Sequence, residues 1–419
     1  MYNPRLMKHV PIQIAAVAIA AIAVLPTCKK KSEPSQSRTR GNIQLQALPY
    51  LSSIEDSDQR EGVVLHDEKR ASPGLNLVTS AVRGETYLVD MDGSVLHTWR
   101  HKYASSATVD ADGNLLCVRG VHGLLALDWD SKELWSVKAS AHHEVVRTAA
   151  GDVWTITRGN QNVNHQGKDV VILDDFLARK APGGESLEQI SVHEFLGDRI
   201  PAERFERILA TVDESAPEGG RRLRTRTARD PAHDVFHTNA ITPIEREVPG
   251  VASPGDLLIS VREIDFVGIV RPSTKKIVWE FEGELDRQHH PTLLDNDHIL
   301  IFDNGTRRGY SRVIEVDPRT QEVVWEYSGK PEKSLFSERQ GAAQRLANGN
   351  TLVTVSYDGR AIEITSDGEI VWDYLMYRRT ADTREPIYRM IRIHGDIERA
   401  LRTRAGSAAP QEPAANDAP

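Results

Sequence analysis

Short apolar runs, each preceded by a turn, recur along most of the chain. In "DADGNLLCV", "TAAGDVWTI", "LDNDHILIF" and "LANGNTLVT" a turn residue stands at the same place before the run, and these residues are Gly113, Gly151, Asp297 and Gly349. Gly, Asn and Asp accept the positive φ angles that tight hairpin turns require. The pattern therefore predicts a series of β-hairpins.

A second repeated element is a strand that ends on tryptophan. The last three copies, "KKIVWEFEG", "QEVVWEYSG" and "GEIVWDY", place their tryptophans 46 and 47 residues apart. Repeats of this length with three or four strands each are typical of a β-propeller. We predict an all-β, six-bladed β-propeller with one partly helical insertion, whose blades span roughly residues 77–104, 105–140, 141–196, 236–284, 285–330 and 337–376.

The propeller is expected to occupy residues 61–396, with two irregular features. Residues 197–235 form an insertion that contains "PAERFERILATV" (201–212), the main stretch with a helical period. The first blade is one strand short, and "PIYRMIRI" (386–393) is expected to return, complete it and close the ring. Residues 397–419 are predicted to be a disordered tail.

The N-terminus has the pattern of an export signal. Basic residues precede the apolar stretch "VPIQIAAVAIAAIAVLPTC", which is short for a membrane span. "LPTC" resembles a bacterial lipoprotein box with Cys28 as the lipidated residue, although Thr27 departs from the usual small residue, so an uncleaved anchor or another cleavage site stays open. We expect a signal peptide over 1–28, a flexible tether over 29–60, and a body that is periplasmic or membrane-anchored outside the cytoplasm.

Composition narrows the classes of partner. Hydrophobic residues make up 39% and charged residues 27% of the 419-residue chain, which is typical of a globular protein. The net charge of −8 and the scattered basic residues argue against nucleic acid as a partner. Cys28 and Cys117 are the only cysteines, so lipidation of Cys28 leaves no internal disulfide. Cys117 lies in the apolar run "GNLLCVRG", where a buried, inert thiol is expected.

Histidines occupy matching places in three blades. His143 precedes Gly151, and His289 precedes Asp297, by eight residues each, and "DVFHTN" puts His237 at the start of the first strand of its own blade. Because the first strand of each blade lines the central channel, these side chains are expected to face one another across one mouth.

The same spacing places small residues in two other blades and leaves a choice at two histidine pairs. Ser105 and Gly341 fall at the equivalent position and leave room for a ligand. His142 and His290 are adjacent alternatives, since side chains alternate along a strand. The register favours His143 and His289.

Two kinds of chemistry fit three facing histidines. A histidine-only set suits zinc or copper, although the chain has no tight His-x-His spacing and no evident carboxylate in the channel. Alternatively, a neutral imidazole acts as a nucleophile toward sulfur, phosphorus or acyl centres. Arg262 in "LLISVREID" lies behind His237 and Asn239, and its forked guanidinium suits an oxyanion such as sulfate or phosphate.

Six segments of the chain together resemble a known family. The segments "GETYLVDMDGSVLHTW", "AHHEVVRTAAGDVW", "DVFHTNAITPI", "LLISVRE", "QHHPTLLDNDHILIFDNG" and "GAAQRLANGNTLVT" are together similar to the bacterial arylsulfate sulfotransferases. The resemblance covers about residues 62–394, and its most specific parts are "HTN…SVR" and "QH…FDNG". It implies an exported six-bladed propeller that moves a sulfuryl group between phenols without a nucleotide sulfate donor.

The resemblance also implies roles for individual residues. His289 matches the histidine that becomes sulfurylated, and the residues that match those binding the sulfuryl group are His143, His237, Asn239 and Arg262. The substrates would be small aryl sulfates and phenols, and no cofactor is expected because phenolates are weakly basic leaving groups. Unlike the larger members, this chain has only a short segment before the propeller and no cysteines for a disulfide near the site.

The expected reaction is a ping-pong transfer. His289 attacks the sulfur, and a second phenol, deprotonated by His143 or His237, then takes the sulfuryl group while Arg262 and Asn239 hold its oxygens. Two other classes stay open. One is a non-catalytic extracytoplasmic lipoprotein that binds a sulfated or phosphorylated ligand, and the other is a metal- or quinone-dependent enzyme.

Overall fold

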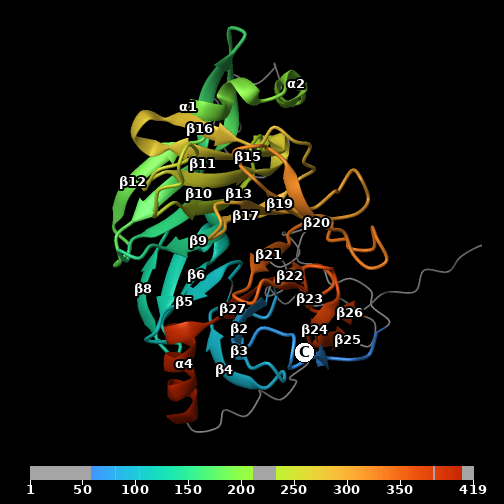
Figure 1. Cartoon of the computed structure of the whole chain (residues 1–419). Coiled ribbons are helices and arrows are strands. Elements are labelled where there is room, and N and C mark those ends of the chain that lie inside the picture. Colours follow the sequence, from blue (N-terminus) through green and yellow to red (C-terminus); the bar gives the residue numbers. More distant parts are fainter. Residues whose placement is uncertain (1–57, 81, 103, 211–232, 381–382, 408–419) are drawn as a thin grey trace, which may run out of the picture. The chain divides into compact units, whose positions relative to one another are not determined.

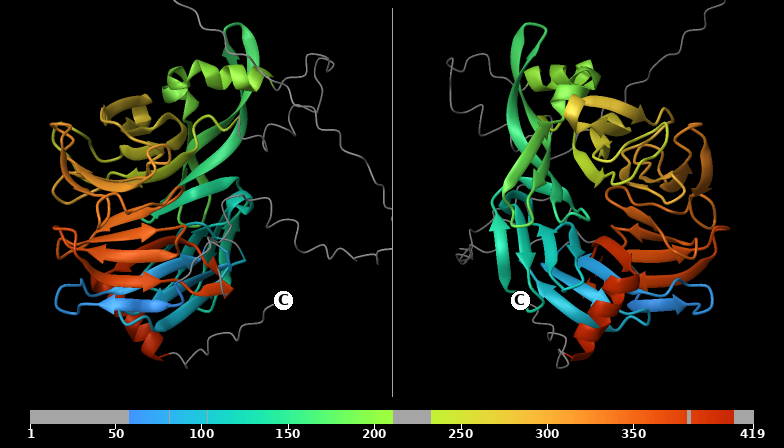
Figure 2. Two further views of the ribbon diagram at one scale, coloured as in Figure 1. Left: turned by 90° about the vertical axis from the view of Figure 1, so that its right-hand side faces the viewer. Right: turned by 60° about the vertical axis from the view of Figure 1, so that its left-hand side comes forward.

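The computed structural model describes residues 58–80, 82–102, 104–210, 233–380 and 383–407, which all fall within one compact unit. In this part of the chain six antiparallel sheets form a six-bladed β-propeller (Figures 1 and 2). The predicted fold class is confirmed.

Five of the six blades have four strands, and the sixth has five, in the following order from the channel outward. The first blade holds β27 (Ile387–Ile393), β2 (Leu75–Ser80), β3 (Glu85–Val89) and β4 (Val95–Arg100). The second holds β5 (Ala107–Val109), β6 (Leu115–Val118), β7 (Leu124–Leu127) and β8 (Glu133–Val137). The third holds β9 (Ala141–Arg147), β10 (Val153–His165), β11 (Lys168–Lys180) and β12 (Ser186–Ser191).

The remaining blades follow the same plan. The fourth holds β13 (Thr238–Pro243), β14 (Leu257–Val261), β15 (Phe266–Arg271) and β16 (Lys276–Glu280). The fifth holds β17 (His289–Leu293), β18 (Ile299–Asp303), β19 (Arg312–Val316) and β20 (Val323–Tyr327). The sixth holds β21 (Ala342–Arg345), β22 (Thr351–Val355), β23 (Arg360–Ile364), β24 (Ile370–Leu375) and β1 (Gly62–His66). A small hairpin, β25 (Arg378–Thr380) and β26 (Thr383–Arg384), follows β24.

The ring is closed by strands from both ends of the described chain. The C-terminal strand β27 pairs with β2 from Leu75↔Ile393 to Ser80↔Ile387, and the two lie side by side in Figure 1. The first strand, β1, pairs with β24 and so extends the last blade. The return of residues 386–393 to complete the first blade therefore has the form that the sequence indicated.

The repeated tryptophans join successive blades. The indole Nε1 of Trp99 donates a hydrogen bond to the carbonyl of Gly113, in the turn of the next blade. Three others do the same between the fourth and fifth, the fifth and sixth, and the sixth and first blades, so each indole nitrogen reaches a turn of the next blade. These pairs are Trp279 with Pro318, Trp325 with Ser366, and Trp372 with Met91.

The third blade carries the insertion. Its hairpin β10–β11 is 13 residues long on each side, and it projects past the other blades in Figure 2. Helix α1 (His193–Leu196), the 3-10 helix η3 (Gly197–Arg199) and helix α2 (Ala202–Ala210) follow, and Phe205 and Ile208 of α2 pack against Val163 and Val170 of the hairpin. Residues 211–232, including the basic run, lie outside the described residues.

The prediction of a disordered tail from residue 397 is wrong for residues 397–407. These belong to helix α4 (Gly395–Ser407), whose Leu401 is fully buried. Arg402 of α4 pairs with Asp90 at 2.8 Å, and the guanidinium of Arg404 lies 5.4 Å from the ring centroid of Trp129. A polar sequence with one buried leucine is thus held by contacts with the first two blades, which the local pattern did not reveal.

Three other predictions concern the N-terminal region and the cysteines. Residues 1–28, with Cys28, and most of the predicted tether lie outside the described residues. Within the described ranges, no helix is both long and apolar enough to span a bilayer. Cys117 is buried as expected, and burial raises the pKa of its thiol to about 12.

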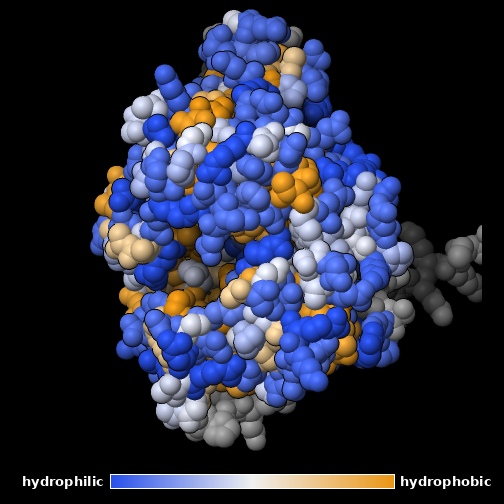
Figure 3. All heavy atoms as spheres, in the orientation of Figure 1, coloured by the Kyte–Doolittle hydropathy of each residue, from blue (hydrophilic) through white to orange (hydrophobic). Residues whose placement is uncertain are grey.

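Hydrophilic residues dominate the face shown in Figure 3, where hydrophobic residues form only small separate groups. The core instead lies between neighbouring blades, as in the buried cluster that includes Ile299, Ile301 and Ile314 of the fifth blade and Leu258 and Ile269 of the fourth.

Candidate active site

The three histidines from the register argument meet at one mouth of the channel, which we define as the end where β9, β13 and β17 begin. The Nε2 atoms of His143 and His237 lie 2.9 Å apart. The ring centroid of His289 lies 6.1 Å from that of His143. The equal spacing to the turns thus brought His143 and His289 together, and the start of the fourth blade's first strand added His237.

A β-bulge stands at the start of each of these innermost strands. The pairing register shifts between Thr155 and Ile156 opposite β9, between Thr238 and Ala240 in β13, and between His289 and Thr292 in β17. The backbone is left-handed at three histidines, with φ of 60° at His143, 51° at His237 and 49° at His290. Bulges re-aim side chains beside active sites, and such conformations cost about 1 kcal/mol or more each.

The bulges correct one sequence-based argument, that only one histidine of each adjacent pair can face the channel. The rings of His142 and His143 lie 4.9 Å apart, and His142 also lies 6.1 Å from His237. His142 is fixed by Asp175, whose Oδ1 lies 3.0 Å from its Nε2. His290 lines a deeper cavity, and its Nε2 lies 3.9 Å from Glu144. Alternation fails here because the extra residue of a bulge interrupts the pleat.

The hydrogen bonds of His289 fix which of its nitrogens carries the proton. Its Nδ1 lies 2.6 Å from Oδ1 of Asn304 and 3.1 Å from the carbonyl of Arg287. The Asn304 amide nitrogen donates to the carbonyls of Ser337 and Gln340, at 2.8 and 2.5 Å, so its oxygen must face the imidazole. Nδ1 is therefore the donor, and Nε2, which has no hydrogen-bond partner among the described residues, carries the lone pair.

A chain of hydrogen bonds fixes the other two histidines. Asp234 Oδ2 accepts from His237 Nδ1 at 2.6 Å, which leaves His237 Nε2 as an acceptor for the Nε2–H of His143. Nδ1 of His143 lies 2.9 Å from the hydroxyl oxygen of Tyr388, and that hydroxyl also donates to the carbonyl of His143 at 3.2 Å. This arrangement makes His237 Nε2 a basic nitrogen that is oriented by a carboxylate, as in catalytic triads.

The environment keeps the histidines neutral. Burial, and then the charge of Arg262, lowers the pKa of His289 to about 3. Burial, followed by the neighbouring His237, holds the pKa of His143 well below its usual range. The pKa of His237 is also lowered by burial, although Asp234 opposes that shift. A neutral His289 with a free Nε2 is a competent nucleophile at neutral and mildly acidic pH.

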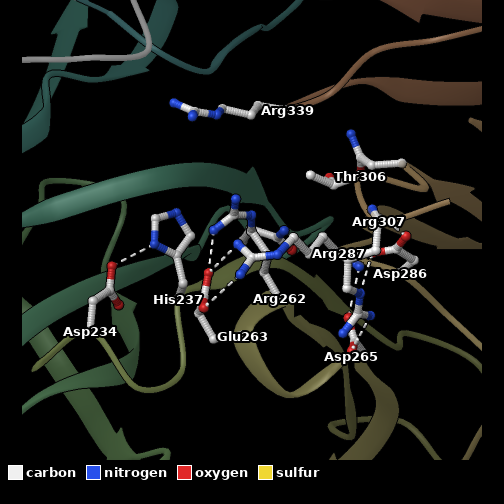
Figure 4. Close-up of polar contacts among 12 residues, drawn as sticks. Asp234, His237, Arg262, Glu263, Asp265, Asp286, Arg287, Thr306, Arg307 and Arg339 are labelled. Atoms are coloured by element: carbon white, nitrogen blue, oxygen red, sulfur yellow. Dashed lines mark hydrogen bonds and ion pairs between the residues drawn. The ribbon is translucent and has the colours of Figure 1, made fainter. Parts of the chain in front are cut away.

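Arg262 begins the 3-10 helix η5 (Arg262–Ile264) directly after β14 rather than lying on the strand. Its backbone N–H donates to the carbonyl of His237 at 3.3 Å, and its guanidinium pairs with Glu263 (Figure 4). Burial, and then the charges of Arg287, Arg339 and Arg204, lowers the pKa of Arg262 to about 10. It stays cationic at neutral pH beside His289, where it can stabilise an oxyanion.

Asn239, which was expected to bind the sulfuryl group, contacts the backbone just before His289. Its side chain is buried, and its amide nitrogen donates to the carbonyl of Gln288 at 2.8 Å. Gln288 is buried as well, and its amide donates to Ser260 and to the carbonyl of Phe266. In this structure one amide N–H of Asn239 therefore holds the backbone that carries His289.

The sequence reasoning missed the residues that orient the histidines. These are Asp175, Asp234, Asn304 and Tyr388, together with Glu144, which accepts two hydrogen bonds from Arg389 at 2.8 and 2.7 Å. Asn304 lies within the quoted "FDNG", so a signal for it was present. Asp175 and Tyr388 come from distant parts of the chain and had no local signal.

Two further observations bear on what the site could hold. Within the described ranges, no group of three or more His, Cys, Asp and Glu side chains is arranged to hold a metal ion. A cavity of about 720 Å³ extends from His290 and Arg389 along β17 and β21 toward their turns at Asn296 and Gly349. It thus leads away from the mouth, along the channel.

Comparison with known proteins decides the family. The model of the arylsulfotransferase (ASST) family matches residues 108–377, well over half of the chain. The chain belongs to the arylsulfotransferase family. Membership supports an arylsulfotransferase-type function, with aryl sulfates and phenols as the substrates that the family implies. A comparison with curated proteins gave no match.

The arylsulfotransferase chain is also similar to several solved structures. A protein of unknown function from Bacteroides caccae shares 13% identity over 72% of this chain and 94% of its own, with a TM-score of 0.46. The Cps50 (Swd1) β-propeller domain of Myceliophteria thermophila shares 11% over 75% and 88%, with a TM-score of 0.42. A streptogramin B lyase shares 11% over 79% and 88%, with a TM-score of 0.43. Similarities of this size do not bear on activity.

Proposed function

We propose that this protein transfers a sulfuryl group from a phenolic sulfate ester to a phenolic acceptor through an N-sulfohistidine at His289. The observation that carries the proposal is the hydrogen bonding of His289, because Asn304 and the Arg287 carbonyl hold the proton on Nδ1 and leave the Nε2 lone pair free. Family membership supports the same class of reaction.

In the first half-reaction Nε2 of His289 attacks the sulfur of the donor. The new N–S bond forms as the S–O bond to the aryl group breaks, and the phenolate leaves with the electron pair. Because the imidazole keeps its Nδ1 proton, the intermediate is a sulfated imidazolium whose ring charge is stabilised by Asn304 Oδ1. Arg262 faces the negative oxygens of the sulfuryl group.

In the second half-reaction an acceptor phenol replaces the first. The hydroxyl of the acceptor replaces the N–H of His143 as the hydrogen-bond donor to Nε2 of His237 and gives up its proton there. Asp234 stabilises the resulting imidazolium of His237. The phenol oxygen attacks the sulfur, the N–S bond breaks, and its electron pair returns to His289. His237 then releases the acceptor's proton to solvent, where the departed phenolate takes one up, and the enzyme is regenerated with His237 neutral and the same proton on Nδ1 of His289.

The test is transfer from a chromogenic aryl sulfate to phenol, measured with protein truncated before residue 41, beside a His289→Asn variant. Asn is smaller than His and retains an amide for the local hydrogen bonds. Turnover that requires the acceptor and is lost in the variant supports the proposal. Release of no chromophore from several donors by the folded protein contradicts it and favours a non-catalytic anion-binding propeller.

We also propose that the protein is exported and held at the membrane through Cys28. The apolar segment, the "LPTC" pattern and the polar residues 29–60 support this proposal. Fractionation of cells that express the full chain or its Cys28→Ser variant tests it. Loss of the membrane-bound fraction in the variant is expected, and an unchanged fraction argues for an uncleaved apolar anchor instead.

A further inference from the structure

An excess of positive charge surrounds one carboxylate beside the candidate site. The side chain of Glu263 is only 8% exposed and pairs with three guanidinium groups, those of Arg204, Arg262 and Arg287. Arg287 donates to Glu263 Oε1 at 2.8 Å and to Oε2 at 3.3 Å. We call these three arginines, with Arg339, the arginine cluster. One carboxylate cannot neutralise three guanidinium groups, so the cluster has capacity for a further anion.

Among the described residues, the other nearby carboxylates form ion pairs outside the cluster. Asp234 is held by His237 at 2.6 Å and by Arg158 at 3.3 Å. Asp265 and Asp286 pair with Arg307, on the outer side of the same loops (Figure 4). In the part of the chain that the structure describes, Arg339 has an ion-pair partner only in the exposed Glu338, at 3.9 Å.

The cluster leads outward from the histidines. Arg262 is the charge that acts most strongly on His289, whereas Arg287 and Arg339 act on Arg262. The side chains of Arg262, Arg287 and Arg339 are 14%, 30% and 39% exposed, so solvent access increases from Arg262 to Arg339. Figure 4 shows Arg339 extending from the loop between β20 and β21 toward the side of the site that holds His237 and Arg262.

A sulfuryl group on His289 has Arg262 as its cation, which leaves Arg287 and Arg339 without a role in the transfer itself. The part of an aromatic substrate farther from the sulfur would have to extend toward solvent, and Arg287 and Arg339 are the more exposed members of the cluster. Guanidinium groups in this position bind carboxylate or sulfate oxygens through paired hydrogen bonds.

We propose that Arg287 and Arg339 form a second anion subsite, and that the preferred substrates are phenols and aryl sulfates that carry an additional anionic group such as a carboxylate. The inference rests on the proposed sulfuryl transfer at the same site. Because donor and acceptor phenols occupy the same place in turn in a ping-pong reaction, the subsite selects both.

The test compares 4-hydroxybenzoate with 4-hydroxybenzamide as acceptors, with 4-nitrophenyl sulfate as donor. The two acceptors are close in size and differ in charge. The wild-type protein is expected to favour the acid in kcat/KM by about 10-fold or more, and added salt should reduce this preference. In the Arg287→Gln/Arg339→Gln double variant the ratio should fall to within about 2-fold of unity.

An Arg319→Gln variant removes the same kind of charge from the exposed pair with Asp297 and should keep the wild-type ratio. Equal rates for both acceptors in the wild type, or a preference that survives in the double variant, would overturn the subsite while the transferase stands.

Calorimetric binding of the same two compounds separates the two proposals. If neither acceptor is turned over but the acid binds more tightly and needs both arginines, the subsite stands and the proposed function fails. If the two compounds bind equally, the subsite fails.

Discussion

The Nδ1 atom of His289 lies 2.6 Å from the Oδ1 atom of Asn304, and this contact decides which imidazole nitrogen can react. Asn304 has no freedom to turn, because its amide nitrogen is bound by the carbonyls of Ser337 and Gln340. The loop after the fifth blade thereby sets the tautomer of a residue that begins that blade's first strand.

Replacement of Asn304 should therefore act on the first half-reaction. Asn304→Ala removes the acceptor that fixes the proton on Nδ1, and release of the first phenol should slow by about 10-fold to 100-fold. Asn304→Asp keeps an acceptor at this place but makes it negative, which raises the pKa of His289. The rate of the first half-reaction in this variant should therefore fall as pH decreases below neutrality. Stopped-flow measurement of the burst across pH checks both variants; identical, pH-independent losses in the two would indicate a merely structural role.

Replacement of Asp234 should act on the second half-reaction. Asp234→Asn removes the charge that stabilises protonated His237, and transfer to the acceptor should slow by about 100-fold, while the burst of the first phenol changes less. Asp152 and Arg179 form an ion pair within the third blade. Asp152→Asn is the matched control and should leave both steps unchanged. Equal slowing of both half-reactions by Asp234→Asn would contradict the assignment of His237 as the base.

The fold was predictable because its signals are local and repeated. Each turn residue precedes an apolar strand, and Trp99, Trp279, Trp325 and Trp372 recur because each indole reaches a turn of the next blade. Helix α4 has no such repeat. Its single buried leucine and its arginines matter only because Asp90 and Trp129 of other blades are present to receive them.

The site was predictable only in part. Spacing to the turns placed His143 and His289 together, since register is carried along a strand. The bulges interrupt the alternation of side chains, so His142 also joins the cluster. The hydrogen bond from Asn239 to the Gln288 carbonyl had no signal in the sequence. Asp234 lies within "DVFHTN", three residues before His237, so a signal for it was present, whereas Tyr388 depends on a contact between blades that a single sequence does not encode locally.

A buried ion pair links the third blade to the closing strand. Arg389 of β27 donates two hydrogen bonds to Glu144 of β9, and both side chains are buried. Arg389→Met leaves an unpaired carboxylate, which should lower the free energy of unfolding by about 3–5 kcal/mol. Denaturant unfolding measures this loss. The Arg389→Met/Glu144→Gln double variant should recover part of it, whereas a further loss in the double variant would show that the two residues act separately.

Acidic pH should destabilise the fold. Burial lowers the pKa of His97, His101 and His142 to about 4, and that of His289 to about 3. In the unfolded chain these groups titrate near their usual values, so the unfolded state binds more protons between roughly pH 6.5 and pH 4. The stability that depends on neutral imidazoles is thus complete above that window and lost as pH falls through it.

Denaturant unfolding at pH 7, 6 and 5 measures the effect. Each buried histidine should contribute up to about 1.4 kcal/mol per pH unit within the window. Stability that stays constant or increases between pH 7 and pH 5 would show that these histidines are protonated in the folded protein.

The most direct test of the account is to trap the intermediate. The protein would be mixed with excess aryl sulfate in the absence of acceptor, quenched at alkaline pH, digested and analysed by mass spectrometry. The account predicts the added mass of one sulfuryl group on the peptide that contains His289, lost when phenol is added before the quench and absent from the His289→Asn variant. A sulfuryl group on another residue, or turnover with acceptor but no covalent adduct, would contradict it.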